Sequence, residues 1–427
     1  MSEIEKGMES FFGRGKFEIK PFADGLCCYI GCFGNVGVVE TDEGLILFDL
    51  AIRHFGRYVF RAVRNFSDKP IKYIIYSHGH FDHCFGYAPF IKEIKRKGFE
   101  MPQIIAHENL LKRFPKYEIL EEHQSWSYRQ QFASVGVGQA DTLSIRERLD
   151  PTIIIRNNEI YEFKLGKYTF EIYHDKGETD DSIWMYFPEK KVIFSGDLVV
   201  SAFPNVGSPF RVQRYAKQWA NANEKMMEKN VDYLLPGHGR LIEGKEKIKE
   251  VLSVTAESMH FVHDEVVKRL NEGKWFEEIY HEMLDILPEK LETHRYLRPT
   301  YGDYRFAIHD VYRLYHGWYE TGNPTDLFPS KSNEIAKEFL KVANESNFLE
   351  RAKELVEEGK TQLALHVLDV IIKANDTANQ EVLLEALKLK HNIVKQKAKE
   401  EKSFIAMNIL NTNALQINNK LKELEKS

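Results

Sequence analysis

The sequence has few cysteines and no excess of basic residues. Four cysteines among 427 residues are too few for a scaffold built on disulfides. Lys and Arg together number 59, against 64 for Asp and Glu, which gives a formal net charge of -5. Proteins that bind nucleic acid usually carry a basic surface, so nucleic acid is not an expected partner.

Long apolar runs and several catalytic motifs are also missing. No stretch approaches the roughly 18 uncharged apolar residues that a membrane-spanning helix needs, and the N-terminus lacks the apolar core of a secretion signal. We therefore predict a cytoplasmic protein that does not bind membranes. The phosphate loop, the Gly-x-Gly-x-x-Gly fingerprint and the Gly-x-Ser-x-Gly elbow are absent too, which argues against nucleotide binding and a serine nucleophile.

The pattern of short apolar runs divides the chain in two. Up to about residue 245, runs rich in Val, Ile, Tyr and Phe alternate with helical segments, which predicts one α/β layered domain. The expected strands are Gly34–Glu40, Leu45–Leu50, Tyr73–Ser77, Gln103–Ala106, Thr169–His174, Ile183–Phe187 and Val192–Ser195. After Gly244, apolar residues recur at helical spacing, as in Ile248–Leu270. We predict an α/β domain at 1–245 and an all-α domain at 246–427.

A dense group of metal-ligand residues, His78-Gly79-His80-Phe81-Asp82-His83, follows the apolar run Tyr73–Tyr76. Three imidazoles and one carboxylate within six residues suit zinc or a similar metal. The spacing directs His78 and His80 to one metal, and Asp82 and His83 to a second. Two such metals can share a hydroxide that is nucleophilic at neutral pH. The alternative is a His-rich surface loop without a ligand.

Two later turns offer further ligands. Asp197 follows the apolar run Lys191–Phe194, and His238 follows Val231–Leu235. Each is an ordinary turn residue when taken alone. Because both come after predicted strands, in order behind the first motif, we expect them at the same edge of the domain, with Asp197 bridging the two metals.

This arrangement resembles the metallo-β-lactamase fold superfamily. The residues that carry the resemblance are Asp49 after Leu45–Phe48, the motif at 78–83, the Lys176–Ser182 turn, Asp197 and His238. They span residues 20 to 245. The resemblance implies an αββα sandwich with two zinc ions per chain.

One position departs from the common form of that superfamily. Where many members have Gly-His-Thr, this chain has Gly177-Glu178-Thr179, so a carboxylate would replace an imidazole as the third ligand of the first metal. His174, at the end of a predicted strand, is the rival for that place. A glutamate in this slot resembles the alkylsulfatase branch, and position within the superfamily favours Glu178.

The second half of the chain resembles the alkylsulfatase dimerisation domain. The match rests on Arg298–Gly302, on His309 and on the run Gly317–Pro324, and it continues through Ala364–Leu387 and the final helix Ser403–Leu415. The resemblance implies a homodimer built by the helical half. The aromatic stretch from Tyr296 to Trp318 is the expected partner surface.

The resemblance also implies residues that hold sulfate downstream of the bridging carboxylate. Asn205 and Arg211 occupy comparable places, and Tyr128 matches a tyrosine near the pocket. Arg211 suits the role because a planar guanidinium can hold two oxyanions. Asp82 is expected both as ligand and as catalytic residue. The family has Glu where this chain has Asp197, and it usually carries a further sterol-carrier-like domain, so a detergent-like substrate is not expected.

These observations lead to one functional hypothesis and two alternatives. We expect a dinuclear zinc hydrolase of the alkylsulfatase type, which cleaves a small anionic sulfate ester with metal-activated water. A second hypothesis keeps the site and changes the substrate to a thioester, lactone or phosphodiester, since a fold does not determine a function. A third is a metal-binding dimeric sensor or scaffold without turnover.

Overall fold

The computed structural model describes residues 18–133 and 148–425, which form two compact units. The first unit holds the described residues up to Arg129 and those from 148 to Glu320. The second holds 130–133 and everything described from Thr321 onward.

The first unit contains a seven-stranded sheet whose strands lie in chain order. The strands are β1 (Ile19–Phe22), β2 (Cys27–Ile30), β3 (Val36–Glu40), β4 (Leu45–Phe48), β5 (Ile71–Ile75), β6 (Gln103–His107) and β7 (Ile153–Ile155). The first four strands form an antiparallel meander, and β4 to β7 run parallel. The continuous apolar sequence of β4 is typical of a parallel strand that is covered on both faces.

A second sheet of six strands packs in the same unit, in the order β13-β12-β11-β10-β9-β8. Its strands are β8 (Ile160–Leu165), β9 (Tyr168–His174), β10 (Ile183–Phe187), β11 (Val192–Val200), β12 (Tyr233–His238) and β13 (Ile242–Glu243). Only β11 and β12 run parallel, and the other neighbours are antiparallel. The parallel pair matters for function, because both strands deliver side chains to one edge.

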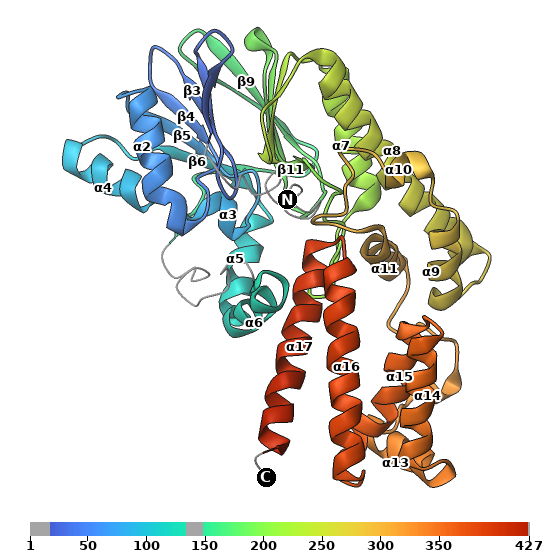
Figure 1. The fold of residues 1–427 in the computed structure, drawn as a ribbon. Helices are drawn as coiled ribbons and strands as arrows, with labels where there is room; N and C mark the ends of the chain where they lie inside the picture. Colours follow the sequence, from blue (N-terminus) through green and yellow to red (C-terminus); the bar gives the residue numbers. More distant parts are fainter. Residues whose placement is uncertain (1–17, 134–147, 426–427) are drawn as a thin grey trace. The chain divides into compact units, whose positions relative to one another are not determined.

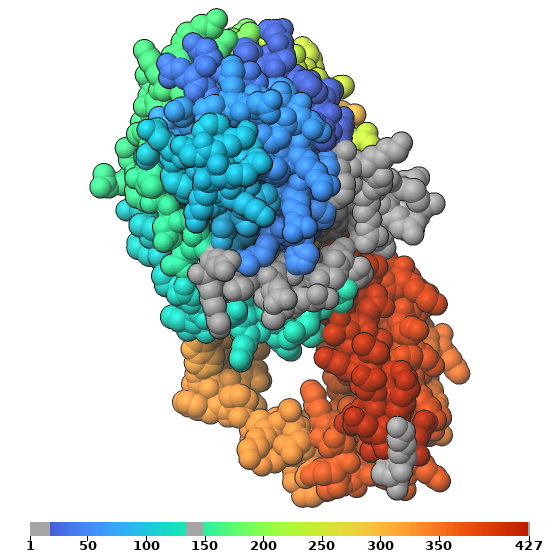
Figure 2. All heavy atoms as spheres, turned by 90° about the vertical axis from the view of Figure 1, so that its left-hand side faces the viewer, coloured from blue at the N-terminus to red at the C-terminus, as the bar shows by residue number. Residues whose placement is uncertain are grey.

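The two sheets face each other and helices cover their outer faces, as Figure 1 shows. Apolar side chains from both sheets, among them Phe48 and Phe194, form the core between them. The first sheet is covered by helices α2 (Gly56–Phe66), α4 (Ala88–Lys97) and α5 (Leu110–Ile119). The outer surface of α2 and α4 faces the viewer in Figure 2. This layering is the predicted αββα sandwich.

Helices also cover the outer face of the second sheet. They are α7 (Ala216–Glu228), α8 (Lys245–Asn271), α9 (Phe276–Asp285) and α11 (Tyr304–Tyr315), and their apolar faces join the second sheet in one core. The short helices α3 (Phe81–Cys84) and α10 (Glu289–Glu292), together with α6 (Glu121–Gln131), complete the helices that begin in this unit. In α8, buried residues recur every three or four positions, as the sequence predicted.

The described residues of the second unit form helices joined by turns, with no strand among them. Its helices are α12 (Pro324–Leu327), α13 (Ser332–Val342), α14 (Glu345–Glu357), α15 (Thr361–Lys373), α16 (Gln380–Glu400) and α17 (Phe404–Leu424). Leu349, Leu368 and Leu387 lie in its core. Ser403 caps α17, because its hydroxyl accepts a hydrogen bond from the backbone N–H of Ala406. The helical half predicted by the sequence is therefore observed.

The strands end near residue 245, as the sequence indicates, whereas the compact units separate after Glu320. Helices α8 to α11 pack on the sandwich and belong to the first unit. That residues 1–245 form the catalytic domain and 246–427 the dimerisation domain stays a prediction. Among the described residues, no helix is both long and apolar enough to cross a membrane.

Candidate metal centre and active site

Strand ends bring the predicted ligands to one edge of the sandwich. Asp49 comes directly after β4, and His78 comes three residues after β5. His238 is the last residue of β12 in the second sheet. The carboxyl ends of parallel strands share an edge, so residues nearly two hundred positions apart in sequence meet there.

Asp197 reaches the same edge in a way that the sequence did not predict. It was expected just past a strand ending at Ser195, but β11 continues through Val200. The pairing of β11 with β12 shifts around Gly196, and this irregularity turns the Asp197 side chain toward the histidines. Gly237 on β12 leaves room for it, because a Cβ there would lie 2.0 Å from Asp197 Oδ1.

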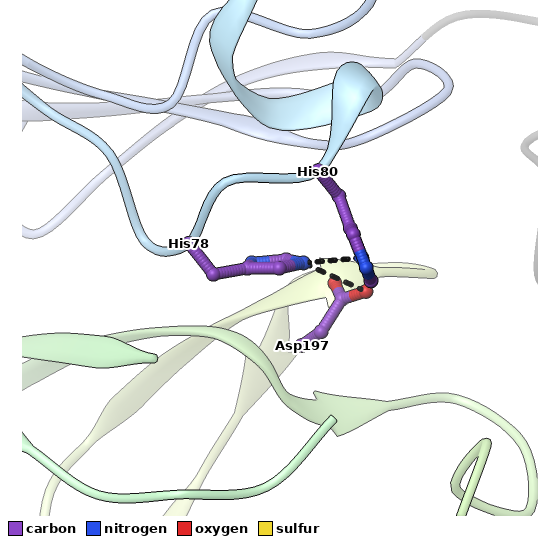
Figure 3. A group of neighbouring side chains, drawn as sticks. All are labelled: His78, His80 and Asp197. Atoms are coloured by element: carbon purple, nitrogen blue, oxygen red, sulfur yellow. Dashed lines mark hydrogen bonds and ion pairs between the residues drawn. The ribbon is translucent and has the colours of Figure 1, made fainter. Parts of the chain in front are cut away.

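His78, His80 and Asp197 form the first group of candidate ligands (Figure 3). One ligand atom of each lies within 4.8 Å of the other two. The Nε2 atom of His78 is 2.8 Å from Nδ1 of His80 and 3.8 Å from Oδ2 of Asp197. All three side chains therefore converge on one small volume.

Asp82, His83 and His238 form a second group with the same spacing limit. Nε2 of His238 lies 3.3 Å from Oδ2 of Asp82, and Nε2 of His83 lies 3.7 Å from that atom. The other carboxylate oxygen of Asp197, Oδ1, is 3.3 Å from His83 and 3.4 Å from His238. Asp197 thus contacts both groups, one with each oxygen.

The buried carboxylates at this edge favour positive charge on the groups around them. Burial disfavours the imidazolium of His238, yet the carboxylates of Asp197 and Asp82 outweigh burial and raise its pKa to about 10. Asp197, Asp49 and Asp82 likewise raise the pKa of His83 well above its ordinary value against the effect of burial. Burial instead lowers the pKa of His78 to about 3, so this imidazole is neutral and keeps a lone pair for a metal.

Asp49 and Ser77 orient the imidazoles from behind. Asp49 Oδ2 lies 2.7 Å from Nδ1 of His83, and Asp49 also accepts hydrogen bonds from the backbone N–H and the hydroxyl of Ser77, both at 2.7 Å. Ser77 Oγ is 3.0 Å from Nδ1 of His78. These contacts leave Nε2 of His83 and Nε2 of His78 facing the ligand groups, as supporting residues do in metal sites.

Glu178 lies beside the first group, and His174 lies elsewhere. Glu178 Oε1 is 3.8 Å from Nδ1 of His80 and pairs with the guanidinium of Arg214, while its buried Oε2 has no hydrogen-bond partner among the described residues. His174 stacks on His107 with ring centroids 3.7 Å apart and bonds the backbone carbonyl of Asp180. The structure thus brings Glu178, and not His174, to the other candidate ligands.

Burial raises the pKa of Glu178 to about 7 even though Arg214 opposes that shift. Arg214 is 3% exposed, and our sequence reasoning did not identify it. Its proximity to Arg211 in the same loop was the available signal. Its backbone N–H donates to Oδ2 of Asp310 on α11 at 3.2 Å, so a residue of the helical layer holds this loop in place.

The residues predicted to hold sulfate lie near each other but differ in their surroundings. The Arg211 guanidinium sits 4.2 Å from the ring centroid of Tyr128 and donates to Oε1 of Gln124 at 3.2 Å. Asn205 is buried, and its amide fits two orientations. In one, Nδ2 donates to Glu178 Oε1 at 3.4 Å. In the other, Oδ1 accepts from Tyr301 Oη at 2.9 Å and from Arg214 at 3.1 Å.

A pocket of about 350 Å³ leads from the first ligand group to the surface of this unit. His80 and Glu178 lie at its inner end, and Arg211 and Arg214 form part of its wall. Asn205 and Tyr128 are not among the residues that line this pocket. The pocket therefore offers a small molecule access to the ligand groups past at least two cations.

The donor set fits a pair of divalent metals. Imidazole nitrogens and carboxylate oxygens are ligands that zinc accepts. His83 Nε2, Asp197 Oδ1 and Glu178 Oε2 are buried, and they form no hydrogen bond with the described residues. Buried polar atoms are rarely left unsatisfied, so the presence of three of them among the candidate ligands indicates that cations would satisfy them.

Comparison with known families covers most of the chain. Residues 29–238 match the model of the metallo-beta-lactamase superfamily, and residues 276–420 match the model described as alkyl sulfatase dimerisation. The first match contains every candidate ligand from His78 to His238. The second match begins on α9 within the first compact unit and runs to α17.

Curated relatives and a solved structure agree with these matches. A linear primary-alkylsulfatase from Pseudomonas sp. (strain ATCC 19151) is 28% identical over 71% of this chain and 59% of its own length. The alkyl/aryl-sulfatase BDS1 from Saccharomyces cerevisiae is 25% identical over 83% of this chain and 57% of its own length. The chain therefore spans less than three fifths of the length of these relatives.

Among solved structures, the stereoselective inverting sec-alkylsulfatase Pisa1 from Pseudomonas sp. superposes with a TM-score of 0.78 at 21% identity. The superposition covers 92% of this chain and 64% of that protein, and it shows that the fold is shared. The two family matches, which follow one another along the same sandwich and helical layers, agree with that fold. The chain belongs to the metallo-beta-lactamase superfamily, in its alkylsulfatase-like branch, and carries an alkyl sulfatase dimerisation domain.

Proposed function

We propose that this protein is a dinuclear zinc hydrolase that cleaves sulfate esters. The observation that carries the proposal is the position of Asp197, whose two carboxylate oxygens contact different ligand groups. Such a carboxylate can bridge two metals. The similarity to alkylsulfatases supports a sulfate ester over the thioester, lactone and phosphodiester alternatives.

The ligands divide between two metals in this proposal. His78, His80 and Glu178 would hold the first metal, and Asp82, His83 and His238 the second, with Asp197 shared between them. Glu178 offers its unsatisfied Oε2, because Arg214 already occupies Oε1. When bound, the metals would supply a nucleophile at neutral pH by lowering the pKa of water.

The remaining residues bind and orient the ester. Arg211 lines the pocket and forms no ion pair with any described carboxylate, so its planar guanidinium is available for two sulfate oxygens. Tyr128 holds the guanidinium plane from behind. The Asn205 amide steadies Glu178 in one of its two orientations and Arg214 in the other. Asp82 would bind the second metal, and its carboxylate, whose Oδ2 lies 3.3 Å from Nε2 of His238, would orient the attacking water.

A homodimer is part of the proposal. The matched dimerisation family supports it, and α13 carries a row of exposed apolar side chains at Ile335, Phe339 and Val342. Within the predicted aromatic surface, Tyr304 and Tyr312 are instead buried in the first unit, while Trp318 stays exposed. Light scattering on the full chain should give twice the monomer mass, and a monodisperse active monomer would contradict this part. A cytoplasmic location remains a prediction.

The test combines elemental analysis with a substrate panel. Purified protein should hold about two zinc ions per chain, and it should hydrolyse alkyl sulfates faster than thioesters, lactones and phosphodiesters. Asp197→Asn should lose both metals, because Asp197 contacts both groups, whereas the control Asp285→Asn on the exposed end of α9 should keep them. Trace metal in the unmodified protein, or turnover of another ester class alone, would overturn the proposal.

A further inference from the structure

The pocket that leads to the metal groups holds more positive charge than one sulfate requires. Its wall carries Lys112, Arg113, Lys116, Arg211 and Arg214. The acidic side chains of the wall are Glu178 and Asp180. All of these residues belong to the first compact unit, so the charge balance is a property of that unit alone.

Two of the five cations are already neutralised. Arg214 pairs with Glu178. Arg113 pairs with Asp180 and lies 3.1 Å from Oδ1 of the fully buried Asp181. These pairs hold the inner wall of the pocket together, and they leave no acidic side chain of the wall for the remaining cations.

Lys112, Lys116 and Arg211 therefore remain without a carboxylate partner among the residues that the structure describes. Lys112 donates only to the neutral side-chain oxygen of Asn109, at 3.3 Å. Lys112 and Lys116 stand one turn apart on α5, where two like charges repel each other and weaken the helix. A single sulfate monoester brings one negative charge, which Arg211 can hold, and both lysines are left over.

The pocket wall carries both apolar and charged side chains. Its apolar part comes from Leu120, Phe210 and Val212 and from the rings of Tyr117 and Tyr215. Binding of a detergent-like chain depends on burying many methylene groups against apolar surface. The alcohol part of the substrate therefore meets the lysines of the wall as well as apolar side chains.

We propose that the substrate is a sulfate ester whose alcohol part bears a second anionic group, such as a carboxylate or a second sulfate. Arg211 receives the reacting sulfate at the inner end, and Lys112 and Lys116 receive the second anion toward the mouth. This inference rests on the proposed sulfatase function and specifies its substrate class. The ordinary alternative, two solvated lysines that contact no substrate, makes the opposite prediction below.

The experiment compares two alkyl sulfates of equal length, one ending in a methyl group and one in a carboxylate. The metal-loaded full chain should show a kcat/KM at least about tenfold higher for the carboxylate substrate, because two cations meet the extra charge. In the Lys112→Gln, Lys116→Gln double variant, KM for that substrate should rise about tenfold with little change in kcat. The methyl-ended substrate should change less than about twofold.

A matched control removes the same charge from another helix. Lys92 and Lys95 on α4 are exposed, lie one turn apart and pair with no described carboxylate, so Lys92→Gln, Lys95→Gln should leave the preference intact. Equal or better turnover of the methyl-ended substrate by the unmodified protein would overturn the inference while leaving sulfatase activity established. A preference for the carboxylate substrate that survives in the Lys112→Gln, Lys116→Gln variant would also overturn the inference.

Binding of sulfonate analogues, which are not hydrolysed, separates this inference from the proposed function. Calorimetry should show about tenfold tighter binding of the carboxylate-bearing sulfonate, lost in the double variant. If that difference appears without hydrolysis of any sulfate ester, the proposed function fails and the second-anion site stands. If neither turnover nor binding discriminates, the second-anion site is refuted.

Discussion

Replacing Gly237 by alanine should weaken metal binding without unfolding the protein. The new Cβ would lie 2.0 Å from Asp197 Oδ1 and 2.7 Å from two backbone atoms, the nitrogen of Asp197 and the carbonyl carbon of Gly196. Ordinary contacts of a Cβ begin near 3.4 Å, so the carboxylate must retreat by about 1.4 Å or the two strands must separate. Metal–ligand distances tolerate changes of only about 0.2 Å.

The expected size of the effect follows from that mismatch. Disturbing a residue that positions ligands typically costs 10- to 100-fold in metal affinity, which corresponds to ~1.4 to ~2.8 kcal/mol. Crowding also costs ~1–3 kcal/mol of folding stability whether or not metal is present. The two effects separate when thermal unfolding is measured with zinc and after treatment with a chelator.

The assay is a competition between the protein and a zinc-binding dye, followed by elemental analysis. Gly237→Ala should release zinc at 10- to 100-fold lower dye concentration than the unmodified protein, and zinc should stabilise it less against heat. Gly317→Ala is the control, because Gly317 is exposed and no atom lies within 4 Å of the added Cβ. Equal zinc affinity in Gly237→Ala and the unmodified protein would refute the bridging role of Asp197.

Three further predictions concern Glu178 and the residues around it. Glu178→Gln should lower metal content toward one zinc per chain and abolish turnover, whereas His174→Ala should keep both; elemental analysis showing the reverse would make His174 the ligand. Arg214→Met should destabilise the protein by ~1–3 kcal/mol in urea unfolding, because the buried Glu178 loses its ion-pair partner and must take up a proton; an unchanged midpoint would contradict this. Burial raises the pKa of Asp310 to about 7, while an unfolded aspartate titrates near 4, so between these pH values the folded state binds more protons and stability falls as pH rises. Asp310→Asn should remove up to ~1.4 kcal/mol per pH unit of this slope in urea unfolding between pH 5 and pH 7, and Asp285→Asn should leave it unchanged.

Much of the site is readable from local sequence, because its first motif follows one strand directly. The apolar run before His78 predicts a buried strand, and four ligand-type residues in six positions leave little room for another interpretation. Helical periodicity likewise predicts α8 and the helices of the second unit. These features depend on residues that are close in sequence, so each can be predicted from a short segment alone.

Features that depend on distant residues needed the tertiary structure. The bulge that aims Asp197 at both histidine groups arises from the pairing of β11 with β12. Folding brings Arg214 into an ion pair with the buried Glu178. It also packs α11 against the loop of Arg214, so that Asp310 accepts a hydrogen bond from the backbone of that loop. The position of a bulge, and the partner of a buried charge, depend on contacts between segments that sequence patterns treat separately.

The sequence by itself therefore determined the layered fold, the helical second half and most of the candidate ligands. Only the tertiary structure decided how those ligands share Asp197, that Glu178 rather than His174 lies beside them, and which pocket cations remain unpaired. The physical reason is the separation in sequence of the residues that interact. Apolar periodicity and ligand-type motifs are properties of short segments, whereas charge compensation and ligand geometry are set by side chains that meet only after folding.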